Sequence, residues 1–287
     1  MKRLSSIILP CITIVTLATL LLLSSTGASA AAPQRQHNSC GVWSTVSSPN
    51  PGTSYNSLNG VAANNIWAVV GYNDASNNAL TLIEHWNGTK WSIVPSPNVA
   101  SLSNGLSAIS AVSATDIWAV GNASGNNGFQ PLIEHWNGTN WTIATSTGTV
   151  QLTGVAAIAS NNVWAVGNIS SPNLIQTLVE HWNGTTWSVV SSSGPGGAYN
   201  TLNGVAAISA NNLWAVGDDA MNITPHTDYL PLIEHWNGTS WSVVNSPSPG
   251  STASDLLAVA RVPATHNVWS VGFTQGSIYQ TLTEFRC

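Results

Sequence analysis

Positive charge is scarce in this chain. Its 287 residues include 6 Lys and Arg against 11 Asp and Glu, and charged residues make up only 6% of the sequence. A nucleic-acid-binding surface needs a basic patch that neutralises phosphates, and these few cations cannot form one. We therefore exclude nucleic acid as a partner and expect a surface covered by Asn, Ser, Thr and Gly.

Long hydrophobic runs are also missing, except at the N-terminus. Lys2 and Arg3 precede an apolar run from Ile7 to Leu23, which is followed by the small residues "GASA". This is the organisation of a secretory signal peptide, the alternative being a transmembrane anchor. We predict a signal peptide over 1–30, a flexible segment over 31–39 and a secreted mature chain without a membrane span.

The rest of the chain consists of five similar units. Each contains a segment in which a Trp is followed by "AVG" or a close variant. The segments are "LNGVAANNIWAVVG" from Leu58, "LSAISAVSATDIWAVG" from Leu106, "LTGVAAIASNNVWAVG" from Leu152, "LNGVAAISANNLWAVG" from Leu202 and "LLAVARVPATHNVWSVG" from Leu256. Their tryptophans are 51, 46, 50 and 55 residues apart. This period is typical of propellers and other repeat arrays.

Within one unit the apolar runs are short, β-branched and bounded by Asn, Ser and Gly, a pattern that predicts strands. An "NG" pair lies between the third and fourth of these runs, for example between "TLVEHW" and "TWSVV". It predicts a tight hairpin with positive φ at both central positions. Four antiparallel strands, A to D, repeated five times predict an all-β fold, a five-bladed β-propeller.

The last unit lacks strand D, and the missing strand lies at the other end of the sequence. "CGVWSTVSSPNPG" from Cys40 matches "GTKWSIVPSPN" from Gly88. We therefore predict a propeller over 40–287 whose ring is closed by the N-terminal strand. In this register Cys40 and Cys287 take the places of two adjacent residues. A disulfide, with a Cα separation of about 4.4–6.8 Å, can replace the peptide bond there. Two unrelated free thiols are the alternative.

The segment "LNGVAAISANNLWAVG" followed by "HWNGTSW" resembles the bacterial-neuraminidase-repeat, or Asp-box, propellers, including the photosystem II stability and assembly factor-like proteins. The resemblance covers all five units and implies a blade, not an activity. The Asp of the Asp-box is missing here. Sialidases of this kind hold the substrate carboxylate with an arginine triad, whereas only Arg261 and Arg286 lie in these strands and loops. The number of units is similar to that of the five-bladed lectin tachylectin-2.

The two faces of such a propeller differ in sequence. The A–B and C–D turns are short and nearly constant, and we call their side the turn face. The B–C loops and D–A links vary in length and content, and we call their side the loop face. Aromatic residues lie in or beside this second set: Tyr55, Tyr72, Phe129, Tyr199, Tyr229, Phe273 and Tyr279. We predict that these residues bind the ligand, since binding residues are usually placed on loops of a rigid scaffold.

Four Glu-His pairs recur in the third strands, Glu84-His85, Glu134-His135, Glu180-His181 and Glu234-His235. They could be acid–base pairs or metal ligands, but neighbouring residues of a strand point to opposite faces. A feature repeated in four units is explained more simply as part of the scaffold. The recurring tryptophans are likewise predicted to pack between blades.

The longest B–C connection, "GDDAMNITPHTDYLP", is acidic. It groups Asp218, Asp219, His226 and Asp228, and oxygen-rich loops of this kind can bind calcium. A solvated acidic loop is the alternative. No other cofactor is predicted.

No catalytic pair or nucleophile stands out from the repeated background. We therefore predict a secreted, non-enzymatic recognition module that binds glycans or another polar surface through the loop face. The alternatives are an extracellular protein-interaction or structural propeller, and a glycoside hydrolase or lyase. A hydrolase would need two carboxyl groups about 5 to 10 Å apart. The candidates for these are Asp74, Asp218, Asp219, Asp228 and Asp255.

Overall fold

The computed structural model describes residues 45–49, 54–100, 102–125, 128–146, 150–222, 229–247, 253–276 and 278–287, with the backbone alone for 54–59. These residues form strands and connections without a helix, which confirms the all-β prediction. The compact unit runs from Val46 to Cys287. Within the part described, no helix has the length and apolar character needed to cross a membrane.

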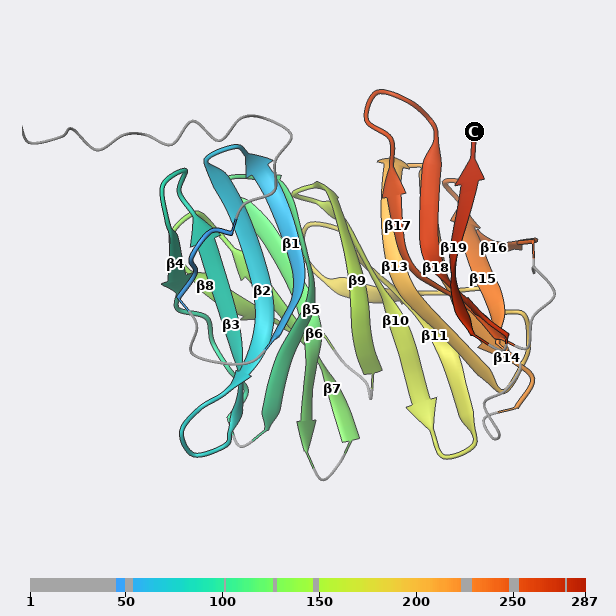
Figure 1. Cartoon of the computed structure of the whole chain (residues 1–287), viewed down its shortest axis with the longest axis horizontal. Helices are drawn as coiled ribbons and strands as arrows, with labels where there is room; N and C mark the ends of the chain where they lie inside the picture. Colours follow the sequence, from blue (N-terminus) through green and yellow to red (C-terminus); the bar gives the residue numbers. More distant parts are fainter. Residues whose placement is uncertain are drawn as a thin grey trace, which may run out of the picture. The chain divides into compact units, whose positions relative to one another are not determined.

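Each of the first four repeats folds into four consecutive antiparallel strands (Figure 1). The first sheet contains β1 (Ser54–Ala62), β2 (Asn65–Asn73), β3 (Ala79–Trp86) and β4 (Trp91–Val94). The second contains β5 (Ser103–Ser113), β6 (Asp116–Gly125), β7 (Gly128–Trp136) and β8 (Trp141–Ala144). The third contains β9 (Val150–Ala159), β10 (Asn162–Ser171), β11 (Leu174–Trp182) and β12 (Trp187–Val190). The fourth contains β13 (Tyr199–Ser209), β14 (Asn212–Ala220), β15 (Leu230–Trp236) and β16 (Trp241–Val244).

The fifth sheet has three described strands, β17 (Ala253–Arg261), β18 (Val268–Gln275) and β19 (Tyr279–Arg286). A single parallel pair, Ile175 with Tyr199, links the third and fourth sheets. The first strands of consecutive sheets contact one another, β1 with β5, β5 with β9, β9 with β13 and β13 with β17. Successive repeats therefore pack side by side in chain order.

The C–D turns differ from the predicted two-residue hairpin. Four residues separate Trp86 from Trp91, which face each other across the two strands. Gly88 has a φ of 93°, whereas Asn87 is not among the non-glycine residues with positive φ. The Asn87 side-chain oxygen instead accepts the backbone N–H groups of Thr89 at 3.0 Å and Lys90 at 3.1 Å. The prediction of positive φ at both positions was wrong, because the Asn acts through its side chain and only the Gly needs the left-handed backbone.

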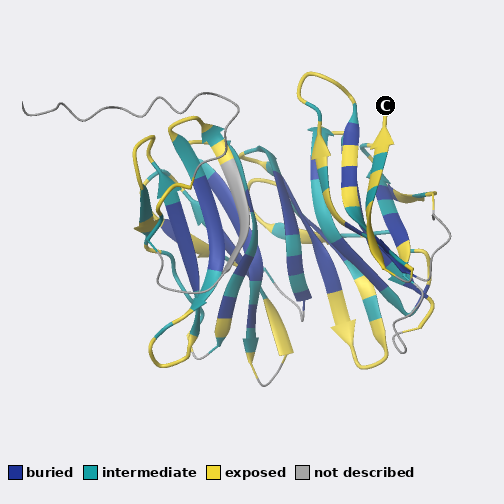
Figure 2. Cartoon of the chain, in the orientation of Figure 1, coloured by how far each residue is buried: buried dark blue, intermediate teal, exposed yellow. Residues whose placement is uncertain are grey.

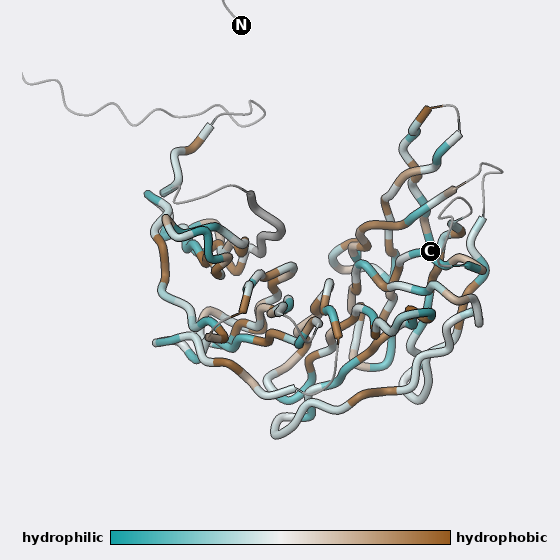
Figure 3. The backbone as a smooth tube through the Cα atoms, turned by 90° about the horizontal axis from the view of Figure 1, so that it is seen from below, coloured by the Kyte–Doolittle hydropathy of each residue, from teal (hydrophilic) through white to brown (hydrophobic). Residues whose placement is uncertain are grey.

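The core lies between successive sheets, as predicted for the tryptophans. Trp67 of the first sheet is 3% exposed and packs edge-on against Trp141 of the second, with ring centroids 5.7 Å apart. Trp118 meets Trp187 and Trp164 meets Trp241 in the same way at the next two junctions. In β2 and β3, for example, a run of four buried residues is flanked by more exposed ones (Figure 2). Hydrophobic stretches recur along the backbone (Figure 3).

The Glu-His pairs are structural, as predicted. Glu180 is buried and accepts a hydrogen bond at 2.8 Å from Ser146, which follows the last strand of the preceding sheet. Equivalent Ser–Glu bridges are Ser48–Glu84, Ser192–Glu234 and Ser246–Glu284. His181 stacks on Trp164 with centroids 4.2 Å apart and bonds Asn162 at 3.0 Å. The Glu thus links two sheets while its neighbour on the opposite side of the strand buttresses a core Trp.

The ends of the propeller sequence lie partly outside the described residues. Within the part described, β19 pairs with β18 alone, and Thr45–Pro49 is not in a strand. Cys287 is exposed and carries a free thiol, while Cys40, the signal peptide 1–30 and the segment 31–39 lie outside the described residues. The disulfide and the closure of a five-bladed ring therefore stay predictions.

Candidate functional site

Four of the predicted ligand-binding aromatics lie on the fourth and fifth sheets, at the loop-face ends of their strands. The Tyr199 and Tyr229 rings are 5.8 Å apart, and those of Phe273 and Tyr279 are 5.3 Å apart. The other three belong to other sheets: Tyr72 lies on β2 and Phe129 on β7, and the side chain of Tyr55 lies outside the described residues. The loop face is therefore not equally aromatic, and the rings gather at one junction.

Asp218 is the most buried acidic group of this junction. It follows the "WAVG" segment on β14 and is 4% exposed. Thr201 lies opposite it on β13, and the Thr201 hydroxyl donates a hydrogen bond to the Asp218 carboxylate at 2.5 Å. The position that Asp218 occupies is held by Asn168 in the third sheet and by Asn122 in the second, each directly after "WAVG". A negative charge thus replaces a neutral amide in the fourth sheet.

Asp255 reaches the same junction from the fifth sheet. It lies on β17, and the Asn203 side chain of β13 donates a hydrogen bond to it at 2.9 Å. Burial, and then the charge of Asp218, raise the pKa of Asp255 to about 7. The same two causes raise the pKa of Asp219 to about 6. These carboxyls therefore titrate near neutral pH, and their protonated forms can donate hydrogen bonds.

The tyrosines complete the group. Burial, followed by the charge of Asp218, the Tyr229 hydroxyl and the charge of Asp255, raises the pKa of Tyr199 to about 12, so this phenol is neutral at physiological pH. The pKa of Tyr229 is raised by burial and by Asp218 and Asp255. The Tyr229 carbonyl accepts the Ser254 N–H at 2.8 Å, which ties the fourth sheet to the fifth. We call Asp218, Asp255, Tyr199 and Tyr229 the Asp–Tyr site; Asp219 follows Asp218 on β14 and so lies on the opposite face of that strand.

This site combines groups that can donate and accept hydrogen bonds with aromatic rings. Neutral carboxyls and phenols both donate and accept, and the Tyr rings offer flat apolar surfaces. Among the residues that the structure describes, no group of three or more His, Cys, Asp and Glu is placed to hold a metal ion. His226 and Asp228 lie outside the described residues, so the calcium prediction remains a prediction.

The structure separates the other predicted carboxylate from this group. Asp74 lies in the β2–β3 loop of the first sheet, where its carboxylate accepts the N–H groups of Ser76 at 2.9 Å and Asn78 at 2.8 Å. These bonds lower the pKa of Asp74, led by the side-chain bond from Asn78. Asp74 therefore shapes its own loop, while Asp218 and Asp255 interact across two sheets.

Thr201 and Asn203 were missed in the sequence. Thr201 occupies in β13 the position that Asp255 occupies in β17, one residue before the recurring Leu. Its polarity could have marked it, but its pairing with Asp218 depends on the strand register. A β-bulge between Leu202 and Gly204 sets that register.

Comparisons with known proteins give the fold. No protein-family model matches the sequence, and a search of curated proteins finds no match. The chain is similar in structure to a neuraminidase-like protein of A/little yellow-shouldered bat/Guatemala, with a TM-score of 0.53, 12% identity, and 82% of this chain and 80% of that chain covered.

Two further solved structures are similar at lower scores. One is YCF48 bound to a D1 peptide, with a TM-score of 0.48, 13% identity, and 82% of this chain and 66% of that chain covered. The other is a GH32 β-fructofuranosidase of Bombyx mori, with a TM-score of 0.45, 11% identity, and 80% and 56% covered. This chain thus spans about two thirds of the length of the first and less of the second. The resemblance to Asp-box propellers holds at the level of fold: the chain is built from β-propeller sheets like those of the neuraminidase-like protein.

Proposed function

We propose that this chain is a secreted recognition module that binds a neutral glycan or a similar hydroxyl-rich ligand at the Asp–Tyr site. The observation that carries the proposal is the replacement of neutral residues by Asp218 and Asp255 at one junction, where two tyrosines also gather. A repeat array keeps its scaffold residues in every unit. A unit that departs from the pattern with buried polar groups at a loop end is a candidate for binding.

The ligand class follows from the groups present. Permanent positive charge is scarce, so an anionic ligand has little to bind to. Carboxyls that titrate near neutrality can donate to or accept from sugar hydroxyls, and the Tyr rings can pack against the apolar faces of a sugar. The Asn203 and Thr201 bonds hold the two carboxyls in fixed orientations before any ligand arrives.

Glycan arrays with the mature protein test this proposal. Saturable binding to a neutral glycan is expected, and Asp255→Ala should weaken it at least about tenfold through loss of one charge-assisted hydrogen bond. Gln151 holds the equivalent position in the third sheet, so Gln151→Ala is the matched control and should bind normally. Tight capture of one protein without any glycan binding would favour the protein-interaction alternative.

A hydrolase is the second candidate function, and one observation favours it. Asp255, with a pKa of about 7, lies near the buried Asp218. An acidic and an ionised carboxyl side by side are the parts of a glycosidase. Turnover of a polysaccharide by the mature protein, lost in Asp255→Asn and in Asp218→Asn, would establish this function in place of simple recognition.

We also propose that the five sheets close into one five-bladed ring. Residues 40–46 would supply the fourth strand of the fifth sheet, and a Cys40–Cys287 disulfide would lock it. Ser48 supports this proposal, because it bonds Glu84 of the first sheet at 2.6 Å as the other bridging serines bond the sheet that follows theirs. Non-reducing mass spectrometry of the exported protein should find one peptide pair that links the two cysteines. Two free thiols would count against the lock.

A further inference from the structure

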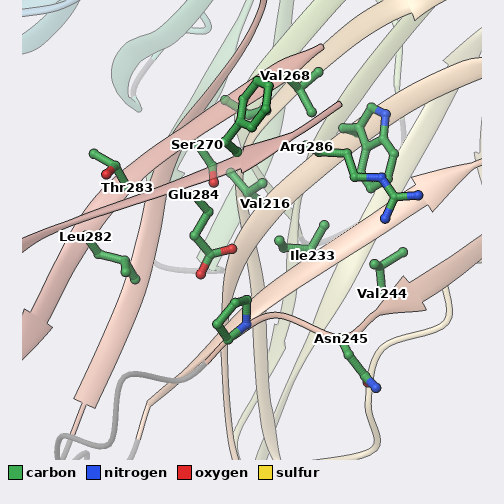
Figure 4. Close-up of a pocket in the computed structure, with 14 residues that line it drawn as sticks. Val216, Ile233, Val244, Asn245, Val268, Ser270, Leu282, Thr283, Glu284 and Arg286 are labelled. Atoms are coloured by element: carbon green, nitrogen blue, oxygen red, sulfur yellow. The ribbon is translucent and has the colours of Figure 1, made fainter. Parts of the chain in front are cut away.

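A cavity of about 370 Å³ lies between the fourth and fifth sheets. Trp214, Ile233 and Val244 line it from β14, β15 and β16, and Val268, Leu282 and Arg286 line it from β18 and β19. Figure 4 shows side chains from both sheets around this space, with Arg286 reaching across from β19. The lining is mostly apolar, so the cavity is suited to an apolar group and not to a polar ligand.

The three preceding junctions show what normally occupies this position. Between the first and second sheets the corresponding cluster includes Trp67, Ile83, Ile117, Leu132 and Trp141. Strand pairing makes Trp214 the equivalent of Trp67, because each lies opposite the His of its sheet. It makes Val268 the equivalent of Ile117 and Leu282 that of Leu132. The cavity is thus the same core with the place of Trp141 not filled by a residue of the described fifth sheet.

The sequence supplies one candidate for that place. Trp43 stands five residues before Ser48, as Trp141 stands five residues before Ser146. Ser48 and Ser146 make equivalent Ser–Glu bridges to the sheet that follows. The bridge therefore fixes the register of the preceding segment and matches Trp43 to Trp141.

Arg286 gives a second indication. It lies opposite Val268, where Trp136 lies opposite Ile117 in the second sheet. Its guanidinium is 5.4 Å from the centroid of the Trp214 ring, a cation–π contact in place of the Trp67–Trp136 ring contact. At the fourth junction the core Trp is therefore retained as Trp214, and an Arg replaces the Trp that packs against it at the first junction.

We propose that Trp43 fills this cavity and that the docked segment fixes the geometry of the Asp–Tyr site. The two features share their strands. β14 carries both Trp214 and Asp218, and β17 carries both Asp255 and the cavity residue Val259. Packing Trp43 at one end of the junction holds the fifth sheet against the fourth, and with it Asp255 near Asp218. The expected effect on glycan binding rests on the proposed function, whereas the docking of Trp43 rests only on comparison with the other repeats.

Photocrosslinking tests the docking. The mature full chain is made with benzoylphenylalanine in place of Trp43 and irradiated. Crosslinks within one chain to the peptides that contain Val244, Val268 or Leu282 are expected. Crosslinks between two chains would show that a second copy supplies the segment. Crosslinks confined to other regions, or none, would also overturn the proposal.

Hydrogen exchange tests the coupling. Trp43→Ala should speed amide exchange in β17 to β19 by about tenfold or more, because these strands lose packing at the junction. Trp241→Ala is the matched control, since Trp241 packs on Trp164, and its effect should centre on the junction of the third and fourth sheets. Unchanged exchange in β17 to β19 of Trp43→Ala would overturn the proposal.

Glycan binding separates the two proposals. If the wild-type protein binds a glycan and Trp43→Ala binds at least about tenfold more weakly, the coupling is supported. If Trp43→Ala binds as the wild type does, the coupling is refuted and the recognition function stands. If the wild-type protein binds no glycan although the crosslinks form as expected, the recognition function fails and the docking stands.

Discussion

Replacing Trp118 by Ala should be among the most damaging single changes in this protein. Trp118 is 2% exposed, its ring lies 5.5 Å from that of Trp187 and 4.2 Å from that of His135, and its N–H bonds Asp116 at 3.0 Å. Truncating a buried Trp costs about 3–5 kcal/mol, and about 1 kcal/mol of this is the hydrogen bond. Equilibrium urea unfolding should show the loss, and thermal unfolding should shift down by roughly 6–20 °C for a chain of this size.

Trp269 is the equivalent residue of the fifth sheet and provides the comparison. Trp269 is 45% exposed, so with only the neighbours that the structure shows, Trp269→Ala should cost about half as much as Trp118→Ala, roughly 2 kcal/mol. A closed ring would cover Trp269 with the first sheet and bring its cost to that of Trp118. We expect Trp118→Ala and Trp269→Ala to differ by less than about 1 kcal/mol. A cost for Trp269→Ala below half that of Trp118→Ala would refute ring closure, and a cost below about 1 kcal/mol for Trp118→Ala would refute the inter-sheet core itself.

Three further predictions concern single features. Ser146→Ala should lower the free energy of unfolding by about 1–2 kcal/mol in urea unfolding, because it leaves a buried Glu carboxyl without its donor. Stability should fall as the pH rises from about 4 to about 7, because Asp255, whose pKa is raised from 3.8 to about 7, keeps its proton in the folded state and loses it in the unfolded state. Asp255→Asn should remove this part of the slope, whereas Glu134, with a pKa raised to about 8, adds a part of the same sign that remains. Gly88→Ala should lower the melting temperature, because Gly88 has a φ of 93° and an added Cβ would lie 2.7 Å from the Asn64 Cβ, whereas Gly105→Ala has open space and should not.

The sheets were predictable because the same strand signals recur in each of the five units. A single short apolar run is ambiguous, but similar runs that recur in the same order every 46 to 55 residues identify the same four strands in each of the first four units. The turn geometry was not predictable from the "NG" pair. Whether Asn contributes its backbone or its side chain depends on the loop length, and Trp86 pairs with Trp91 and so leaves a four-residue loop.

The candidate site was only partly predictable. The contrast between the short, constant turns and the variable B–C loops and D–A links predicted the loop face, and the tyrosines in these variable segments were visible in the sequence. Sequence could not show that Asp218 meets Asp255, because the two lie on different sheets and their approach depends on how β13 packs against β17. The bond from Asn203 to Asp255 creates that approach. Tyr72 and Phe129, equally aromatic, lie on the first and second sheets and outside this junction.

Comparison of the repeats shows that the fourth junction differs in composition from the first three. At the first three, an apolar cluster fills the space between the sheets, and Ser–Glu bridges span the second and third junctions as Ser146–Glu180 and Ser192–Glu234. At the fourth, the bridge remains as Ser246–Glu284, but an Arg stands where Trp136 stands at the first junction and acidic groups stand at the loop face. The bridge shows that the sheets still pack in the common geometry. The departures around it therefore do not reflect a different fold, and they are the reason why the proposed binding site is assigned to this junction.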